Sequence, residues 1–148
     1  MTLLRPATAA DLPALTAIVD AAYGPYIPRI GRKPGPMTDD YTALVAQGLV
    51  QVLEDQGRVC GLLVLIAQPD ALLLDNIAIA PEAQGRGFGR LLLAAAEHAA
   101  RSAGLPVIRL YTNVAMTENI AIYSRHGYAE TGRRIENGLH RVYMEKRL

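Results

Sequence analysis

The sequence predicts an α/β protein with a mixed, mostly antiparallel central sheet of about seven strands and helices on both faces. The apolar runs within residues 49–80 are separated by short turns, as in an antiparallel meander. A glycine-rich turn then connects a strand to a helix and a further strand, which requires those two strands to be parallel or nearly so. Near the end, Asn137-Gly138 lies between two extended runs and indicates a two-residue hairpin.

The N-terminal part is predicted to hold a short strand at residues 3–5, followed by a helix. Thr8 together with Asp11 resembles a capping box, a pattern that begins helices. Apolar residues then recur at helical spacing, namely at Leu12, Leu15, Ile18, Val19 and Ala22. Glycine and proline at positions 24, 25 and 28 are expected to end this helix.

Residues 23–37 are predicted to form an ordered loop. Four prolines and three glycines exclude long regular structure, whereas the tyrosines and isoleucines argue against a free linker. Arg29, Arg32 and Lys33 are candidates to bind an acidic group, although exposed basic residues in a loop are more often only solvated. A second helix is expected from Thr38, as its N-cap, to Gly48.

The remaining elements follow from changes in hydrophobic period and from turn residues. In the helix predicted at residues 91–103, a narrow face of small residues indicates close packing against a sheet. The predicted strands are residues 49–54, 58–68, 72–80, 107–112, 128–135 and 139–148, and the predicted helices are residues 91–103 and 117–126.

Composition restricts the classes of function. The 148 residues are expected to form a single domain, residues 1–148, and a net charge of +1 argues against nucleic acid or membrane partners. Cys60 is the only cysteine, which excludes intramolecular disulfides and cysteine-based zinc sites. The three histidines show no metal-ligand pattern, so no metal is expected. Without a signal peptide or an apolar stretch of roughly 20 residues, the expected location is the cytoplasm.

Residues 84–90 are the strongest candidate for a binding site. Gly85, Gly87 and Gly89 lie where a strand turns into a helix, so the backbone can adopt positive φ and admit a ligand close to its amides. The free N–H groups and the dipole of the helix start favour an anion, most often phosphate, and Arg86 and Arg90 add positive charge. The alternative is a plain glycine-rich turn with solvated arginines.

Two common nucleotide motifs do not fit this stretch. The dinucleotide fingerprint needs its third glycine three positions after the second, and it opens an all-parallel sheet rather than following three antiparallel strands. A P-loop needs a lysine followed by serine or threonine, and none is present here. A dinucleotide-binding protein therefore remains only as a minor alternative.

A third pattern does fit, and it consists of Gln84-x-x-Gly87-x-Gly89 with Asn119-x-x-x-Tyr123-x-x-x-Gly127-Tyr128 downstream. With these motifs and this order of elements, the sequence resembles the GNAT superfamily of N-acetyltransferases, which use acetyl-CoA. The resemblance covers nearly the full chain. It implies transfer of an acetyl group from acetyl-CoA directly to a primary amine of a small molecule or peptide. The alternative is a CoA-binding regulatory or interaction module without turnover.

The resemblance also implies where the cofactor binds. The strand before the glycine turn is typically bulged and separates from the following parallel strand, so that the pantetheine arm inserts between them. Backbone groups of Ile77 and Ile79 would pair with that arm as a further strand would. Asn119 would bind the arm or the adenosine side. The pyrophosphate would be bound by Gln84, Gly85, Arg86, Gly87, Phe88, Gly89 and Arg90.

Two residues are candidates for proton transfer in such a reaction. Tyr123 would point at the sulfur and act as general acid for the thiolate, although it would otherwise serve to anchor its helix. Asp75 is the candidate general base, acting through water, and its alternative is a strand-end carboxylate with a structural hydrogen bond. A backbone N–H near Ile77 would stabilise the oxyanion. Asn76 is a candidate to orient substrate or water.

The acceptor site is the least specified part. In the family it is shaped by the first helix pair, the loop between them and the final hairpin. The candidates to line it here are Tyr23, Tyr26, Arg29, Arg32, Tyr111 and Tyr143. Such a set would suit a small amine that also carries a carboxylate or phosphate. A homodimer is compatible with the sequence.

Overall fold

The computed structural model describes residues 1–148 and shows one seven-stranded sheet in the order β1-β2-β3-β4-β5-β7-β6. All neighbouring strands are antiparallel except β4 and β5, which are parallel. This confirms the predicted mixed, mostly antiparallel sheet. The strands are β1 (Thr2–Pro6), β2 (Val50–Asp55), β3 (Arg58–Ala67), β4 (Leu72–Ile79), β5 (Val107–Asn113), β6 (Ala129–Glu136) and β7 (Leu139–Arg147).

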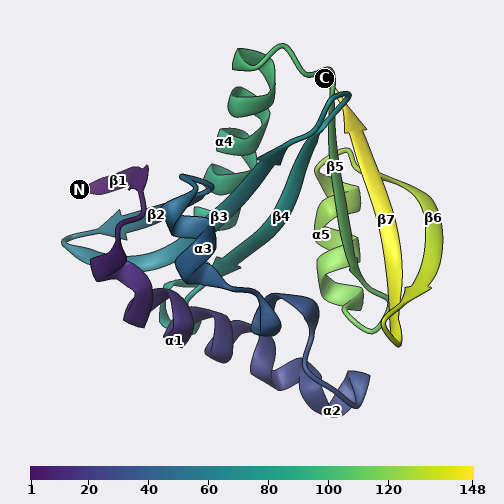
Figure 1. Ribbon diagram of the computed structural model, residues 1–148, viewed down its shortest axis with the longest axis horizontal. Coiled ribbons are helices and arrows are strands. Elements are labelled where there is room, and N and C mark those ends of the chain that lie inside the picture. Colours follow the sequence, from purple (N-terminus) through teal and green to yellow (C-terminus); the bar gives the residue numbers. More distant parts are fainter.

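Helices cover both faces of the sheet, as predicted (Figure 1). Helices α1 (Leu12–Tyr23) and α3 (Tyr41–Ala46) lie on one face, and α4 (Phe88–Ser102) and α5 (Thr117–Arg125) lie on the other. No helix is long and apolar enough to cross a membrane. The α-helices are α1 (Leu12–Tyr23), α2 (Ile27–Ile30), α3 (Tyr41–Ala46), α4 (Phe88–Ser102) and α5 (Thr117–Arg125), and the short 3-10 helices are η1 (Ala9–Asp11), η2 (Gly24–Tyr26), η3 (Gly35–Thr38) and η4 (Pro81–Ala83).

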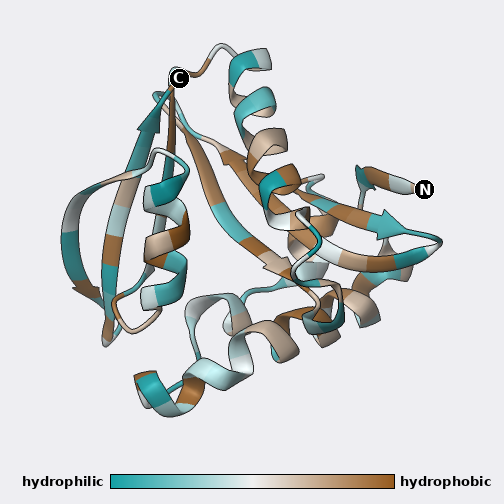
Figure 2. Ribbon diagram, turned by 180° about the vertical axis from the view of Figure 1, so that it is seen from behind, coloured by the Kyte–Doolittle hydropathy of each residue, from teal (hydrophilic) through white to brown (hydrophobic).

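The core forms where the apolar stripes of α1 and α4 meet the central strands. Figure 2 shows hydrophobic residues concentrated on β3 and β4. On α1 the predicted stripe is buried at Leu15, Ile18 and Val19, whereas its two flanking members are partly buried against the core. On α4 the alanines allow the helix to approach the sheet closely. Its buried residues are Phe88, Leu92, Leu93, Ala96 and Ala100.

Two predicted helix starts differ from the structure. Helix α3 begins at Tyr41, because the N-cap is Asp40, whose Oδ1 accepts the Ala43 N–H at 3.1 Å. Thr38 instead ends η3, where its hydroxyl donates to the Gly35 carbonyl at 2.9 Å. Helix α4 begins at Phe88 rather than at residue 91, so its first turn is part of the glycine-rich stretch.

The predicted loop at residues 23–37 contains three short helices, η2, α2 and η3. In each of them a proline occupies the first or second position. Proline is tolerated there because the N–H that it lacks would have no partner within the helix. The prolines therefore divide this segment into single turns rather than preventing helix formation.

Strands β4 and β5 separate soon after they begin. Their parallel pairing is limited to Leu72 with Ile108 and Leu73 with Arg109. On its other side β4 has a bulge, because Val64 pairs with Asn76 while Leu65 pairs with Leu74, which leaves Asp75 unpaired. Figure 1 shows the two strands diverging toward the end at which α2 lies. The bulge and the separation agree with the expectation from the resemblance.

Candidate active site

Two cavities meet in the gap between β4 and β5. One has a volume of about 540 Å³ and borders the glycine-rich turn, and we call it the glycine-turn cavity. The other has a volume of about 510 Å³ and lies between the loop before α3 and the β6–β7 hairpin, and we call it the mixed-charge cavity. The residues that line both are Tyr23, Ile77, Asn119 and Tyr123. These four side chains mark the place where contents of the two cavities would touch.

The glycine-turn cavity is built around the start of α4. Gly85 and Gly87 each have a φ of 81°, a conformation that favours glycine, and Gly87 is the N-cap of the helix. The first N–H groups of α4 therefore face the cavity without side chains in the way. Six of the seven predicted turn residues line it, namely Gln84, Gly85, Gly87, Phe88, Gly89 and Arg90.

Arg86 is the exception among the predicted turn residues, because it does not line the cavity. Its guanidinium forms an ion pair with Asp55 at 2.9 Å and lies 4.7 Å from the centre of the Phe88 ring. The Arg86 side chain thus ties the turn to β2. Positive charge from a side chain in the glycine-turn cavity comes from Arg90 instead.

The backbone of β4 presents polar groups to the gap. The Ala80 N–H donates to the Cys60 carbonyl of β3 at 2.8 Å, and successive residues of a strand direct these groups to opposite sides. Ile77 and Ile79 therefore direct their N–H and C=O groups toward β5, from which β4 has separated. The Ile77 carbonyl is 3.0 Å from the Tyr23 hydroxyl. The Ile77 N–H remains free to bind a ligand.

Tyr123 lies on the shared wall of the two cavities. Its side chain is only 9% exposed, and its ring packs edge-on against Tyr128 with 5.8 Å between ring centres. The Tyr123 hydroxyl has no hydrogen-bond partner in the protein, although it borders both cavities. Burial raises the pKa of Tyr123 above its usual value, with a smaller contribution from Tyr26. The phenol therefore keeps its proton at neutral pH and is able to donate it.

Asn76 takes part in a buried hydrogen-bond network. It is 2% exposed, its Oδ1 accepts from the Tyr23 hydroxyl at 2.6 Å, and its Nδ2 donates to the Tyr41 hydroxyl at 2.9 Å. The Tyr41 hydroxyl donates in turn to the Pro36 carbonyl at 2.6 Å. Asn76 lines the mixed-charge cavity, but tyrosines already use its amide. These bonds position Tyr23 and the loop, and the role of Asn76 in orienting substrate or water stays a prediction.

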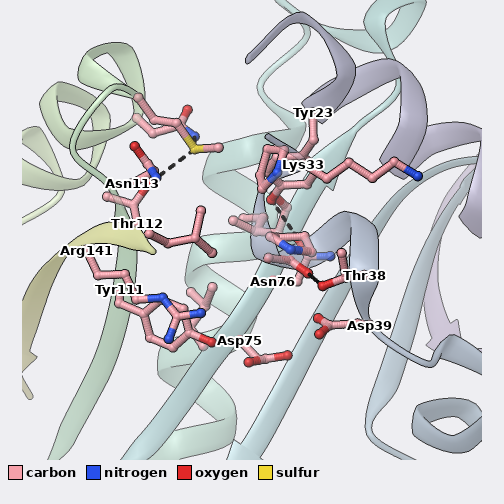
Figure 3. A pocket seen from close by; sticks show the side chains of 18 of the residues that line it. Tyr23, Lys33, Thr38, Asp39, Asp75, Asn76, Tyr111, Thr112, Asn113 and Arg141 are labelled. Carbon is pink, nitrogen blue, oxygen red and sulfur yellow. Dashed lines mark hydrogen bonds between the residues drawn. The ribbon is translucent and has the colours of Figure 1, made fainter. Parts of the chain in front are cut away.

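The mixed-charge cavity brings together Asp75, Asp39 and Arg141 from three separate parts of the chain (Figure 3). Burial raises the pKa of Asp75, while Arg141 opposes that shift. Burial and repulsion by Asp75 raise the pKa of Asp39 to about 6, again opposed by Arg141. Two carboxylates that face one another with raised pKa values form a site that favours a cation.

Sequence reasoning missed Asp39 and Arg141. Asp39 directly precedes the N-cap Asp40, and acidic residues are common at helix starts for reasons unrelated to a site. Arg141 is one of several basic residues in the final hairpin, where solvated side chains are the usual case. Neither position carries a local signal, because the site forms only when the loop and β7 come together.

The predicted acceptor residues separate into three groups. Tyr23, Arg32 and Tyr111 line the mixed-charge cavity, and the Arg32 side chain also donates to the Asn137 carbonyl. Tyr26 lines the glycine-turn cavity only, and its role as an acceptor residue stays a prediction.

Arg29 and Tyr143 line neither cavity, and their roles as acceptor residues stay predictions. Arg29 instead forms an exposed ion pair with Glu118 at 2.7 Å, and the Tyr143 hydroxyl bonds Glu136. Each of these side chains is therefore engaged by a carboxylate outside the mixed-charge cavity.

Comparison with solved structures supports this fold over the whole chain. A GNAT family acetyltransferase from Elizabethkingia anophelis with acetyl-CoA bound superposes with a TM-score of 0.75 at 18% identity, covering 99% of this chain and 98% of that chain. A ribosomal-protein-alanine N-acetyltransferase from Brucella melitensis superposes with a TM-score of 0.71 at 26% identity, covering 99% of both chains.

The sequence itself is similar to mycothiol acetyltransferase of Jonesia denitrificans, at 29% identity over 89 residues, which is 59% of this chain and 28% of that protein. The chain spans less than half of the length of the curated relatives that it matches. Residues 46–130 match the family model described as "Acetyltransferase (GNAT) domain". This match covers more than half of the chain and includes β4, the glycine turn and Tyr123, and the protein therefore belongs to the GNAT acetyltransferase family.

Proposed function

We propose that residues 1–148 act as one domain that transfers an acetyl group from acetyl-CoA to a primary amine of a small molecule or peptide. The observation that carries this proposal is the meeting of two cavities at Ile77 and Tyr123, in a gap where β4 has lost its neighbour. Direct transfer needs donor and acceptor to approach from opposite sides, and this arrangement supplies both sides.

The glycine-turn cavity fits the donor. The amides at the start of α4 and the Arg90 side chain suit a pyrophosphate. The backbone groups of Ile77 and Ile79 suit the amides of a pantetheine arm, which would complete the hydrogen bonding that β5 does not provide. Asn119 lies at the junction, where it would bind the arm close to its thioester end.

Acetyl-CoA supplies the thioester carbonyl, and the chain supplies the groups that assist its reaction. The amine nitrogen forms a bond to the carbonyl carbon, and the Ile77 N–H donates to the oxygen as it gains negative charge. A proton leaves the amine for Asp75, directly or through water. When the carbon–sulfur bond breaks, the sulfur keeps the electron pair and receives the Tyr123 hydroxyl proton. Proton exchange with water then restores the Tyr123 hydroxyl and the Asp75 carboxylate. We infer that the protein works in the cytoplasm on acetyl-CoA present there.

The test is thiol release from acetyl-CoA in the presence of a panel of primary amines, with wild-type protein and Tyr123→Phe. Removal of a general acid typically lowers the rate by about 10²–10⁴-fold, so kcat is expected to fall by at least about 100-fold. The KM for acetyl-CoA is expected to change little, because the Tyr123 hydroxyl bonds nothing else in the protein.

Tight CoA binding without thiol release on any amine would contradict the proposal and favour a binding module. An unchanged kcat in Tyr123→Phe would remove Tyr123 from the chemistry while leaving the acetyltransferase assignment intact. Retained binding of CoA by the variant serves as the check that it is folded.

A further inference from the structure

We propose that the acceptor amine also carries a carboxylate, which Arg141 binds while Asp39 and Asp75 hold the ammonium. The acceptor would thus be a small amino acid or a related zwitterion. This inference rests on the proposed acetyltransferase function and adds the substrate class of the mixed-charge cavity.

The Arg141 guanidinium packs on the Tyr111 ring and forms no hydrogen bond within the protein. Its side chain is 17% exposed, and its guanidinium lies 4.4 Å from the centre of the Tyr111 ring. The nearest carboxylate is Glu136 at 3.6 Å, beyond hydrogen-bond length, and the Tyr143 hydroxyl already bonds that same oxygen. The Tyr128 hydroxyl is the only side-chain donor or acceptor that is both buried from solvent and without a partner, so the Arg141 donors face the open cavity rather than the protein interior. Guanidinium donors that line a cavity without a protein acceptor are available to a ligand with an acceptor group.

The fold holds this guanidinium ready for such a ligand. Stacking on Tyr111 fixes its plane, and Arg141 pairs with Asn113 of β5 in the sheet. On the loop side, a side chain at Gly35 would lie 3.6 Å from Arg141 Nη2, so β7 and the loop approach one another here. A planar guanidinium held in place matches a carboxylate with two parallel hydrogen bonds at little further ordering cost.

The opposite part of the cavity is acidic. Figure 3 shows Asp39 and Asp75 facing one another, with Arg141 and Tyr111 across the cavity from Asp39. Asp75 is the bulged residue of β4 and lies two positions before Ile77, whose N–H faces the gap. An ammonium held by the two carboxylates would thus lie beside the place where the thioester carbonyl is expected. It would first lose one proton to water, which gives the nitrogen its lone pair, and the second proton would leave for Asp75 as the carbon–nitrogen bond forms. Arg141 thus supplies positive charge at one wall and the two aspartates supply negative charge opposite it, while Arg32 and Lys33 of the loop also line the cavity.

This polarity favours a zwitterion over the other amines of similar size. A second ammonium, as in a diamine, would be repelled by Arg141. A phosphate would bring up to two negative charges toward Asp39 and Asp75. The cavity volume of about 510 Å³ lies within the range for small-molecule sites. A carboxylate is the anion that satisfies Arg141 with the least repulsion from the acids.

The experiment compares amino acids with their carboxamides as acceptors, using thiol release and including ω-amino acids with longer spacers. The measured quantity is kcat/KM for each acid divided by kcat/KM for its amide. Because an amide alters the amine's own pKa, the decisive value is this ratio in wild type relative to Arg141→Gln. Loss of a charge-assisted pair is expected to lower the ratio about 10- to 100-fold for the preferred acceptor.

Arg133→Gln is the matched control, because this exposed arginine of the same hairpin pairs with Glu130 and lines neither cavity. Its acid-to-amide ratio should equal that of wild type. Arg141→Lys keeps the charge without the planar fork, and an intermediate ratio is expected. It also serves as the second variant if Arg141→Gln does not fold.

A ratio that both Arg141 variants leave unchanged would overturn the inference, as would a wild-type enzyme that acetylates only neutral amines or diamines. In both cases the acetyltransferase function would stand. Absence of thiol release with every amine tested would instead contradict the proposed function, and the substrate class would fall with it.

Discussion

At the scale of single residues, burial sets the protonation states on which the proposed chemistry depends. It keeps the proton on Tyr123, and it raises the pKa of Asp39 and Asp75, which makes these acids better proton acceptors than exposed carboxylates. Arg141 limits the shift of both acids. The donor and the acceptors of protons thus lie on two walls of one gap, with opposite roles.

Asp39 gives rise to a pH prediction. It faces Asp75 of β4, Arg141 of β7, Tyr111 of β5 and Tyr41 of α3, and its pKa is raised to about 6. An ammonium binds the ionised form, so kcat/KM for the acceptor is expected to rise with pH through about 6. In Asp39→Asn this rise should move to lower pH, because the carboxyl whose pKa is about 6 is removed. The measurement is kcat/KM between about pH 4.5 and 8.

The raised pKa of Asp39 also affects the stability of the fold, and this effect provides a control. A carboxyl whose pKa is higher in the folded than in the unfolded state makes unfolding easier once it ionises. Asp39→Asn should therefore have at least the wild-type free energy of unfolding at pH 7. Two results would contradict this account of Asp39. One is an Asp39→Asn protein that is both less active and less stable than wild type, and the other is a rise of kcat/KM with pH that occurs at the same pH in both proteins.

Prediction from the sequence was most successful where chemistry depends on neighbours along the chain. The spacing of residues 84–90 located the glycine-turn cavity, and the spacing of Asn119 with Tyr123 located the shared wall of the two cavities. It gave no sign that Glu118 and Glu136 engage Arg29 and Tyr143, because nothing local indicates these partners. It also missed Asp39 and Arg141, whose proximity to Asp75 results from the tertiary fold alone.

At the scale of elements, periodicity and turn residues placed all seven strands to within about one or two residues. The Asn137-Gly138 turn is confirmed, with φ angles of 52° and 75°. Helix starts were less predictable, because a cap depends on the one side chain that turns back to the backbone, as Asp40 does. The short helices of residues 24–38 were not predicted, because proline is common in the first turn of a helix but interrupts a helix from within.

The junction of turn and helix at Gly87 can be tested by substitution. Gly87→Ala forces an alanine to a φ of 81° and places a methyl group at the helix start that faces the glycine-turn cavity. We expect a loss of about 1 kcal/mol in the free energy of unfolding and a roughly 10-fold higher KM for acetyl-CoA. Denaturant unfolding and initial-rate kinetics measure the two effects.

Gly104→Ala is the control that separates the effect of backbone strain from the effect on acetyl-CoA binding. Gly104 has a similar φ of 71° but follows the far end of α4 and lines neither cavity. It should show a comparable loss of stability with an unchanged KM for acetyl-CoA. Equal increases of KM in both variants would mean that strain in α4, rather than the amides at its start, controls cofactor binding.

At the scale of the whole molecule, the gap between β4 and β5 divides the sheet into two halves, and the stability of the protein depends in part on what fills this gap. Beyond Leu73, strands β1–β4 and strands β5–β7 share no ladder hydrogen bonds. Ion pairing of Arg29 with Glu118 and the bond from Arg32 to the Asn137 carbonyl connect the halves at the surface. Exposed contacts of this kind contribute little stability, so a ligand that fills the gap should contribute more.

Thermal unfolding tests this dependence. Acetyl-CoA at about 100 times its Kd should stabilise the protein by about 2.7 kcal/mol, which corresponds to a rise in Tm of about 5–10 °C for a domain of this size. NAD at the same concentration should leave Tm unchanged, because the glycine spacing does not fit a dinucleotide. Protection by NAD and not by acetyl-CoA would contradict both the cofactor and the proposed function.

The separation of β4 from β5 also affects how readily the protein aggregates. From Leu74 to Ile79, β4 pairs with β3 on one side but has no neighbouring strand on the other, so its amides and carbonyls directed toward β5 resemble those of an edge strand. Such an edge is a template on which an extended segment of another chain can pair. Occupation of the gap by a pantetheine arm would block that template. A shortage of cofactor would then expose the protein to aggregation as well as halt its reaction.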